Sequence, residues 1–150
     1  MKVLRKYEQN KLKVLRKISI EVPSDLQALD KLLSQFNEIY QEFVPERDWL
    51  QCRLALAEGF TNAVRHAHKN LPSETIIRVE VLLSKDRIKM RIWDSGAAFD
   101  LRGFTKEKAR SQNGWLNSGR GIPLLNKIAD RLEYSRTGNK YNCLLIVKKF

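Results

Sequence analysis

The hydrophobic and polar positions in the first half of the chain predict one strand followed by two helices. Aliphatic and β-branched residues over Lys13–Ile20 predict a strand, which Pro23 ends. Ser24 is a candidate N-cap, and apolar residues then recur at helical spacing through Leu26–Tyr40. A second helix is expected over Pro45–Lys69, because the following Asn-Leu-Pro sequence ends it. Its apolar face is expected to include Leu50, Leu54, Ala57 and Val64.

The second half predicts four strands, one helix and a long irregular segment. Thr75–Leu83 and Arg87–Trp93 read as two strands joined by a short turn. The stretch from Ser95 to Ser118 has little periodicity, and irregular segments of that length are often lids over a binding site. A helix is expected from Gly121 to about Asp130. A final strand pair follows, Leu132–Ser135 and Tyr141–Val147.

This order of elements predicts the fold class. It indicates an α/β (α+β) two-layer sandwich, in which a mixed, mainly antiparallel sheet is covered by helices on one face. The 150 residues contain no internal repeat or flexible linker, so one domain, 1–150, is expected. Cys52 and Cys143 have no partner at metal-ligand spacing and are expected to be buried, reduced thiols.

Composition favours a globular protein in the cytoplasm. The chain is 43% hydrophobic and 30% charged, which is typical of soluble domains and not of disordered ones. No apolar run approaches the roughly 20 residues of a membrane helix, and the N-terminus lacks the apolar stretch of a signal peptide. We therefore expect a cytoplasmic protein without membrane contact.

The formal charge of +11 raises the alternative of a nucleic-acid-binding protein. Residues 1–17 alone carry seven Lys or Arg residues against one Glu. However, the sequence has no nucleic-acid-binding motif and no aromatic residues interleaved on a basic face. A phosphate-binding pocket also needs positive charge, so direct nucleic-acid binding is not expected.

The first chemical motif lies on the second expected helix. Glu58, Asn62 and His66 are spaced four residues apart, and such residues share one stripe of a helix. Glu58 can accept a proton, and the amide oxygen of Asn62 is a hard ligand suited to Mg²⁺. A solvated helix face is the alternative interpretation of this motif. His66 is expected to be structural, and His68 to face solvent.

The second motif is a strand that ends in Trp93-Asp94-Ser-Gly96. A carboxylate at a strand end, partly shielded by Trp93, can accept a hydrogen bond from the exocyclic amine of adenine. Guanine presents a carbonyl oxygen there, and an unpaired buried polar group costs about 1–3 kcal/mol. Gly96 allows the chain to turn sharply after the strand. The alternative is a turn-forming Asp-Ser-Gly without a ligand.

The third motif is Gly119-Arg120-Gly121, immediately before the third expected helix. Glycine backbone at a helix start lets N–H groups approach phosphate oxygens, and the helix dipole favours an anion there. A Gly-x-Gly pair is common, and this one is neither a Walker loop nor a dinucleotide fingerprint.

Together, the three motifs resemble the N box, G1 box and G2 box of the GHKL superfamily, which includes gyrase, MutL and histidine kinases. The short chain and the form Asp-Ser-Gly-Ala-Ala-Phe-Asp over 94–100 resemble the RsbW/SpoIIAB-type anti-sigma factor kinases. The resemblance covers about residues 12–148. It implies the histidine-kinase-like ATPase (Bergerat) fold and a single ATP-binding kinase domain, with a basic N-terminal segment at 1–11 and an ATP lid at 97–118.

The resemblance also implies roles for individual residues. Glu58 would be the catalytic base, and Asn62 would bind Mg²⁺ that bridges the ATP phosphates. Asp94 and Gly96 would contact adenine, and the backbone around Arg120 would contact the phosphates. The complete implied cofactor-binding set is Asn62, Asp94, Gly96, Gly119, Arg120 and Gly121, with Asn62 also the metal ligand. Basic side chains of the lid are candidates for the γ-phosphate, with a solvated basic loop as the alternative.

The resemblance finally implies an activity and partners. The expected function is an ATP-dependent serine/threonine protein kinase and anti-sigma factor, which phosphorylates an anti-sigma-factor antagonist of the STAS type and sequesters a sigma factor. A homodimer is implied in the same way. The main alternative is a non-catalytic ATP-binding switch that binds a protein partner. The detached catalytic half of a histidine kinase is less favoured, because no helix carries a phosphoacceptor histidine at a dimerisation seam.

Overall fold

A single five-stranded sheet forms one layer of the protein. The computed structural model describes residues 13–98 and 121–150. The strands are β1 (Arg16–Pro23), β2 (Ile76–Leu83), β3 (Arg87–Asp94), β4 (Arg131–Thr137) and β5 (Tyr141–Lys149), in the spatial order β1-β2-β3-β5-β4. Each neighbouring pair of these strands is antiparallel. The described sheet is therefore antiparallel throughout, where a mixed, mainly antiparallel one was expected.

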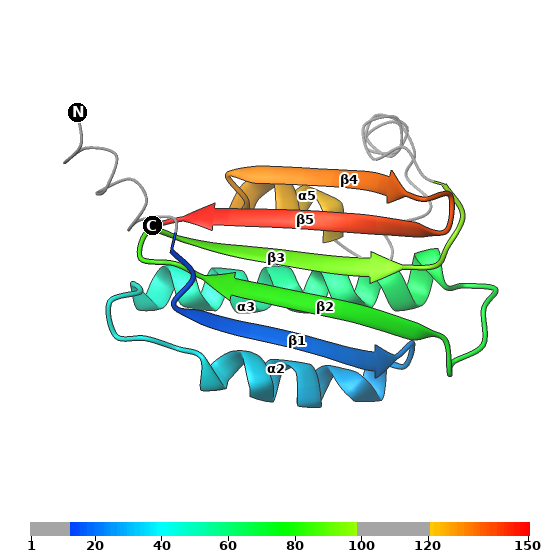
Figure 1. Ribbon diagram of the computed structural model, residues 1–150, viewed down its shortest axis with the longest axis horizontal. Coiled ribbons are helices and arrows are strands. Elements are labelled where there is room, and N and C mark those ends of the chain that lie inside the picture. Colours follow the sequence, from blue (N-terminus) through cyan, green and yellow to red (C-terminus); the bar gives the residue numbers. More distant parts are fainter. Residues whose placement is uncertain (1–12, 99–120) are drawn as a thin grey trace.

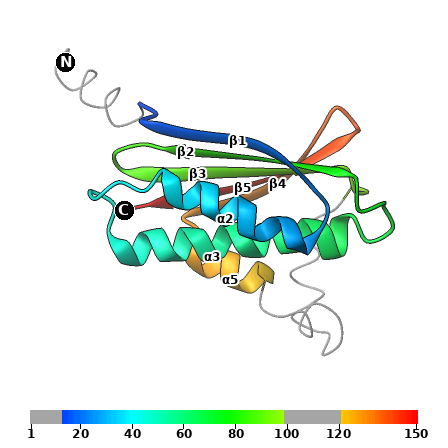
Figure 2. The same cartoon turned by 90° about the horizontal axis from the view of Figure 1, so that it is seen from below.

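The helices form the second layer, on one face of the sheet (Figures 1 and 2). They are the 3₁₀ turn η1 (Leu26–Ala28), α2 (Leu29–Glu38), α3 (Glu46–Asn62), the π-helical turn η2 (Ala63–Ala67) and α5 (Gly121–Ile128). In Figure 2, α2 and α3 lie directly beneath the strands and α5 lies beside α3. This arrangement confirms the predicted α/β two-layer fold class with helices on one face.

Alternating burial along the strands explains why the helices cover only one face. In β3, for example, Ile88, Met90, Ile92 and Asp94 are buried and alternate with half-buried Lys and Arg residues and Trp93. Successive side chains of a strand point to opposite faces, so one face supplies the core and the other meets solvent. The buried strand residues and the inner residues of the helices form one hydrophobic cluster.

The first helical segment begins differently from the prediction. Ser24 was expected to cap it, but Ser24 is buried, and the carboxylate of Asp25 accepts the N-cap hydrogen bond from the backbone N–H of Gln27 at 2.9 Å. Both residues are common N-caps, so the sequence alone did not separate them. The segment starts as η1 and continues as α2, which ends at Glu38.

The predicted apolar face of the second helix is correct for Ala57 and Val64, which are partly buried and pack against the core, but wrong for its two leucines. Leu50 and Leu54 are 53% and 44% exposed. The buried side of α3 instead carries Trp49, Cys52, Ala55, Leu56, Gly59 and Phe60. The helix packs on the sheet, on α2 and on α5, so it has apolar residues on more than one side. The positions of its leucines therefore did not identify the side that faces the core. The α-helical part also ends at Asn62, where the π-helical turn η2 begins.

The β4–β5 hairpin carries two side chains to the end of β3. Gly138 and Asn139, in the tight turn between the two strands, have φ values of 62° and 57°, in the left-handed region. The register places Asn142 of β5 opposite Asp94 of β3, and Tyr134 of β4 opposite Leu144. The sheet order therefore brings residues from β3, β4 and β5 together at one end of the sheet.

Other expectations about the chain have mixed outcomes. Cys52 and Cys143 are buried free thiols, as predicted. No helix within 13–98 and 121–150 is long and apolar enough to cross a membrane. The basic segment 1–11 lies outside the described residues, and so does all of the expected lid 97–118 except its first two residues. The division into one domain with these two segments stays a prediction.

Candidate functional site

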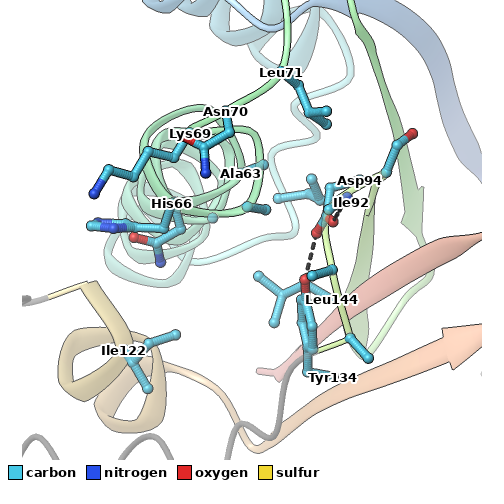
Figure 3. A pocket seen from close by; sticks show the side chains of 17 residues that line it. Ala63, His66, Lys69, Asn70, Leu71, Ile92, Asp94, Ile122, Tyr134 and Leu144 are labelled. Carbon is cyan, nitrogen blue, oxygen red and sulfur yellow. Dashed lines mark hydrogen bonds between the residues drawn. The ribbon is translucent and has the colours of Figure 1, made fainter.

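A cavity of about 510 Å³ lies at the end of the sheet that holds Asp94. Figure 3 shows the last turns of α3 and η2 on one side of it, with His66 and Lys69. Asp94, Leu144 and Tyr134 lie on the other side, and Ile122 at the start of α5 lies below. The volume falls within the range of about 300–1,000 Å³ that is typical of small-molecule sites. The cavity can therefore hold a ligand of nucleotide size.

The cavity walls are mainly apolar, with few polar groups. Gly59, Ala63, Ala67, Ile92, Ile122 and Leu144 supply apolar surface. Among the described lining residues, Asp94 is the only acidic side chain and Lys69 is the only lysine or arginine. An apolar cavity with a small number of polar groups is suited to an aromatic ring that carries a few hydrogen-bonding atoms.

Asp94 is the most buried ionisable group of the cavity wall, only 3% exposed. Its Oδ1 accepts hydrogen bonds from the backbone N–H of Gly96 at 2.9 Å and from Nδ2 of Asn142 at 2.8 Å. Its Oδ2 accepts a hydrogen bond from the hydroxyl of Tyr134 at 2.6 Å. A buried carboxylate needs such donors, because burial without a partner is costly. The carboxylate is therefore held in one orientation at the cavity wall.

The loop after Asp94 is fixed by the same hairpin. Nδ2 of Asn142 also donates to the carbonyl oxygens of Gly96 and Ala97, both at 3.1 Å. The guanidinium of Arg136 donates to the Gly96 carbonyl and to Oδ1 of Asn142, both at 3.2 Å. Asn142 is 1% exposed and thus acts as a buried link between the hairpin and the loop.

His68 holds the loop from the opposite side, and its expected solvent exposure is wrong. The side chain is 3% exposed, and its Nε2 accepts a hydrogen bond from the backbone N–H of Ser95 at 2.8 Å. Because Nε2 is an acceptor, the neutral imidazole carries its proton on Nδ1, which has no hydrogen-bond partner within the described residues. Burial lowers the pKa of His68, and the nearby charge of Asp94 opposes this effect. Helical spacing alone gave no sign of this contact, because the partner, Ser95, lies 27 residues further along the chain.

The π-helical turn allows the backbone of Ala67 to approach Gly96 closely. A Cβ atom on Gly96 would lie 2.5 Å from the carbonyl oxygen of Ala67, a distance that side-chain carbons do not tolerate. π-Helical turns widen a helix locally and are frequent at functional sites. Gly96 therefore lies close to the end of the helix, and its implied contact with adenine stays a prediction.

The polar stripe of the first motif is only partly at the cavity. Asn62 and His66 line it, whereas Glu58 is half-buried on α3 and is not one of the described lining residues. Nδ2 of Asn62 is buried and has no hydrogen-bond partner in the described part of the chain. Unpaired buried amides are uncommon and point to a missing partner such as a ligand. The described residues contain no cluster of three or more His, Cys, Asp or Glu residues that could hold a metal ion.

The third motif is described only at its end. Gly121 is buried at the start of α5, and the next residue, Ile122, lines the cavity. Gly119, Arg120 and the basic lid side chains lie outside the described residues. The structure thus brings Asn62, Asp94 and Gly96 to one cavity and places the beginning of α5 beside it (Figure 3).

Four contributors to the site were missed in the sequence. Tyr134 and Asn142 lie on the last hairpin, and only strand order and register bring them to Asp94. Lys69 lies just beyond η2, at the rim of the cavity. His68 was considered in the sequence, but its side chain was expected to face solvent. His68 and Lys69 are adjacent in the chain but match no motif, and Tyr134 and Asn142 lie more than 60 residues away, so spacing along the chain held no signal for this group.

Comparisons with known proteins agree with this arrangement. A family model described as a histidine kinase-like ATPase domain matches residues 22–148. A serine-protein kinase RsbW of Staphylococcus aureus (strain MRSA252) is 25% identical over 140 residues, which cover 88% of this chain and 87% of the relative.

A second similarity is shorter. The serine-protein kinase RsbW of Listeria monocytogenes serotype 4a (strain HCC23) is 39% identical over 49 residues, or 33% of this chain. That match spans 31% of the relative, so this chain aligns with about a third of the Listeria protein. The similarities confirm the resemblance indicated by the three motifs.

Proposed function

Because the chain belongs to the histidine kinase-like ATPase domain family, we propose that its cavity binds ATP, with the adenine amine at Asp94. The observation that carries this proposal is a carboxylate, 3% exposed, in the wall of a mainly apolar cavity of about 510 Å³. Apolar residues such as Ile92 and Leu144 would pack against the faces of the base. The carboxylate can accept one further hydrogen bond, from the amine of adenine, whereas the carbonyl oxygen of guanine offers no donor and would be repelled by the carboxylate.

The phosphates would extend toward the start of α5. The backbone N–H groups at Gly119, Arg120 and Gly121 are the proposed phosphate donors, since the N-terminus of a helix favours an anion. Buried Gly121 begins α5 beside the cavity, which supports this direction. Lys69 at the rim supplies positive charge for the phosphates.

Asn62 is the proposed contact for Mg²⁺. A magnesium ion usually keeps several waters and takes few protein ligands besides the phosphates, so one amide oxygen fits this cofactor. The buried Nδ2 of Asn62, without a partner in the described chain, also supports a ligand at this position. Bound Mg²⁺ would neutralise phosphate charge, while Asn62 would orient the phosphate end of the nucleotide.

The proposed reaction is serine/threonine protein phosphorylation. Glu58 would accept the proton of a partner's hydroxyl, whose oxygen then bonds to the γ-phosphorus as the bond to the ADP oxygen breaks. Phosphoryl transfer depends mainly on alignment and charge neutralisation, so one base and the metal site are sufficient protein chemistry. Glu58 lies one helical turn before Asn62 on α3, which supports its role beside the phosphates.

The proposed biological role follows the names of the relatives, which are serine-protein kinases of the RsbW type. We propose that the chain is an anti-sigma factor, which phosphorylates a STAS-type antagonist and sequesters a sigma factor in the cytoplasm. Assembly as a homodimer belongs to the same proposal.

A second candidate is a non-catalytic switch that binds ATP only to change its affinity for a protein partner. The observation that favours it is the position of Glu58, which is not among the described residues that line the cavity. In this case, ATP would bind at the same site without phosphate transfer.

Nucleotide binding is tested by calorimetric titration of the purified protein with ATP. Asp94→Asn replaces the acceptor oxygen pair with one oxygen and an amide donor, so ATP affinity is expected to fall at least tenfold. Asp30→Asn, on the exposed side of α2, is the matched control and should bind ATP normally. Equal ATP affinity of wild type and Asp94→Asn would contradict the proposed site.

Catalysis is tested by incubation with labelled ATP and a STAS-domain antagonist encoded in the same genome. The Glu58→Gln variant should bind ATP normally but transfer phosphate at least 100-fold more slowly, because general-base catalysis contributes about that much. Glu46→Gln, at the exposed start of α3, is the control. Absence of transfer by the wild type, with ATP binding intact, would favour the non-catalytic switch.

A further inference from the structure

Tyr134 both lines the cavity and contacts Asp94, and no sequence motif predicts either contact. Its side chain lines the cavity, and its hydroxyl donates to Oδ2 of Asp94 at 2.6 Å (Figure 3). Tyr134 lies on β4 and Asp94 on β3, and β5 separates the two strands in the sheet. The contact therefore depends on the hairpin register and on the length of the tyrosine side chain.

The hydroxyl of Tyr134 is a permanent donor. Burial raises the pKa of Tyr134 far above its ordinary value of about 10, and its hydrogen bond to Asp94 raises the pKa further. The phenol thus stays protonated at neutral pH. Oδ2 of Asp94 therefore always faces a hydrogen-bond donor, the hydroxyl of Tyr134.

The donors around Asp94 leave a limited capacity for a ligand. Oδ1 accepts from the backbone N–H of Gly96 and from Nδ2 of Asn142, which uses both of its lone pairs. Oδ2 accepts one hydrogen bond among the described residues, from Tyr134. Oδ2 therefore keeps the capacity for one more donor, and a purine amine in the cavity can supply it.

We propose that Tyr134 is a specificity-determining residue of this site, which keeps Asp94 an acceptor and thereby selects a purine with an amine at position 6 over one with a carbonyl. This inference rests on the proposed ATP-binding function. With the hydroxyl present, the ionised carboxylate is stabilised by three donors and repels a carbonyl oxygen. Without it, Oδ2 of Asp94 loses the donor that fixes it at the cavity wall. A carboxylate that is no longer fixed there can turn away from a carbonyl oxygen, so discrimination falls.

The aromatic ring and the hydroxyl have separable roles, which makes a conservative variant informative. Tyr134→Phe keeps the ring as part of the cavity wall and removes only the donor to Asp94. Tyr141→Phe is the matched control, because Tyr141 is 48% exposed on the same hairpin and does not line the cavity.

The experiment measures the affinities of wild type and both variants for ATP and for inosine triphosphate, which carries a carbonyl at position 6. Wild type and Tyr141→Phe are expected to prefer ATP. For Tyr134→Phe, ATP affinity should fall about tenfold, as for loss of a charge-assisted hydrogen bond, and the ratio of the two affinities should fall with it. The ratio does not depend on how much of a variant is folded, because unfolded protein reduces binding of both nucleotides equally.

The outcomes separate this inference from the function on which it rests. An unchanged ratio in Tyr134→Phe, with wild type preferring ATP, overturns the role of Tyr134 and leaves ATP binding intact. Tighter ATP binding by Tyr134→Phe also overturns it, because the hydroxyl would then compete with the base for Asp94. If wild type binds neither nucleotide, the proposed function itself fails and this inference fails with it.

Discussion

The backbone N–H of Ser95 donates a 2.8 Å hydrogen bond to Nε2 of His68, a residue 27 positions earlier in the chain. This bond ties the end of the second helical segment to the loop that follows Asp94. The bond holds the loop on one side. On the other side, Asn142 and Arg136 of the β4–β5 hairpin donate hydrogen bonds to the carbonyl oxygen of Gly96 in the loop. The loop that carries Gly96 is thus fixed from two directions before any ligand binds, as preorganised sites require.

The first prediction concerns the stability that His68 provides. His68→Phe removes the acceptor and leaves the Ser95 N–H unpaired, so the free energy of unfolding should fall by about 1–3 kcal/mol. His68→Gln is the matched variant, because its amide oxygen can accept from Ser95 while the residue does not titrate. Urea denaturation measures both, and equal stability of His68→Phe and wild type would contradict the importance of the bond.

The second prediction concerns pH, and its sign follows from burial. Burial lowers the pKa of His68 in the folded protein, so folding favours the neutral form. The unfolded chain then binds more protons between the lowered pKa and the ordinary value near 6.5, and stability falls as the pH falls through this window. Above that window the contribution is fully present.

The measurement is the free energy of unfolding of wild type and His68→Gln between pH 7.5 and 5.5. The difference between the two proteins isolates His68, because other titrating groups are shared. Wild type should lose stability relative to His68→Gln as the pH decreases. A difference that stays constant over this range would show that His68 does not carry the effect.

The sequence predicted the fold better than the contacts of the site. Alternation in strands such as β3 and glycine or proline at element ends were sufficient for the order of elements, because these signals are local. Asp94 and Gly96 could be proposed for the same reason, since a strand end and a sharp turn are adjacent in the chain. By contrast, Tyr134 reaches Asp94 only through the sheet order β3-β5-β4. Pairing across the sheet is not encoded in local spacing.

The misassigned residues on the second helical segment have a related cause. Leu50 and Leu54 were expected on the apolar face of this helix, but both are exposed, and Ala55 and Gly59 are among the residues on its buried side. At Gly59 the packing of α3 on β3 is close, since a Cβ atom there would lie 2.6 Å from Cδ1 of Ile92. The positions of the leucines alone therefore did not identify the buried side of the helix.

The third prediction uses the close approach of Gly96 to the carbonyl of Ala67. In Gly96→Ala the new methyl group would lie 2.5 Å from a backbone oxygen, which cannot move as a flexible side chain can. The loop must shift, so we expect a loss of about 1–3 kcal/mol in stability and weaker nucleotide binding. Gly138→Asn is the control, because Gly138 has open space around it and asparagine tolerates its positive φ.

Thermal unfolding and ATP titration check this prediction together. Gly138→Asn should stay within about 0.5 kcal/mol of wild type and bind ATP normally. If Gly96→Ala is as stable as wild type and keeps its ATP affinity, the approach of the helix end to the loop is unimportant for the site.

The fourth prediction concerns the two thiols. Cys52 is fully buried, and burial is the main cause that raises its pKa to about 12. Burial also raises the pKa of Cys143. The thiolate is the reactive form, so neither thiol should react with an alkylating or disulfide reagent in the native protein at pH 8. Both should react after denaturation in urea. Rapid modification of one thiol in the folded protein would contradict the burial of that residue.

The last prediction concerns Asn62, whose buried amide nitrogen has no hydrogen-bond partner in the described part of the chain. An unpaired buried polar group lowers stability, so Asn62→Ala should be at least as stable as wild type. The same change removes the proposed Mg²⁺ ligand, so the increase of ATP affinity on addition of Mg²⁺ should fall about tenfold. Asn126→Ala, on the exposed side of α5, should change neither quantity. A stability gain with a loss of Mg²⁺-dependent affinity is the pattern of a residue kept for binding. A large loss of stability with unchanged Mg²⁺ dependence would instead show that Asn62 supports the fold.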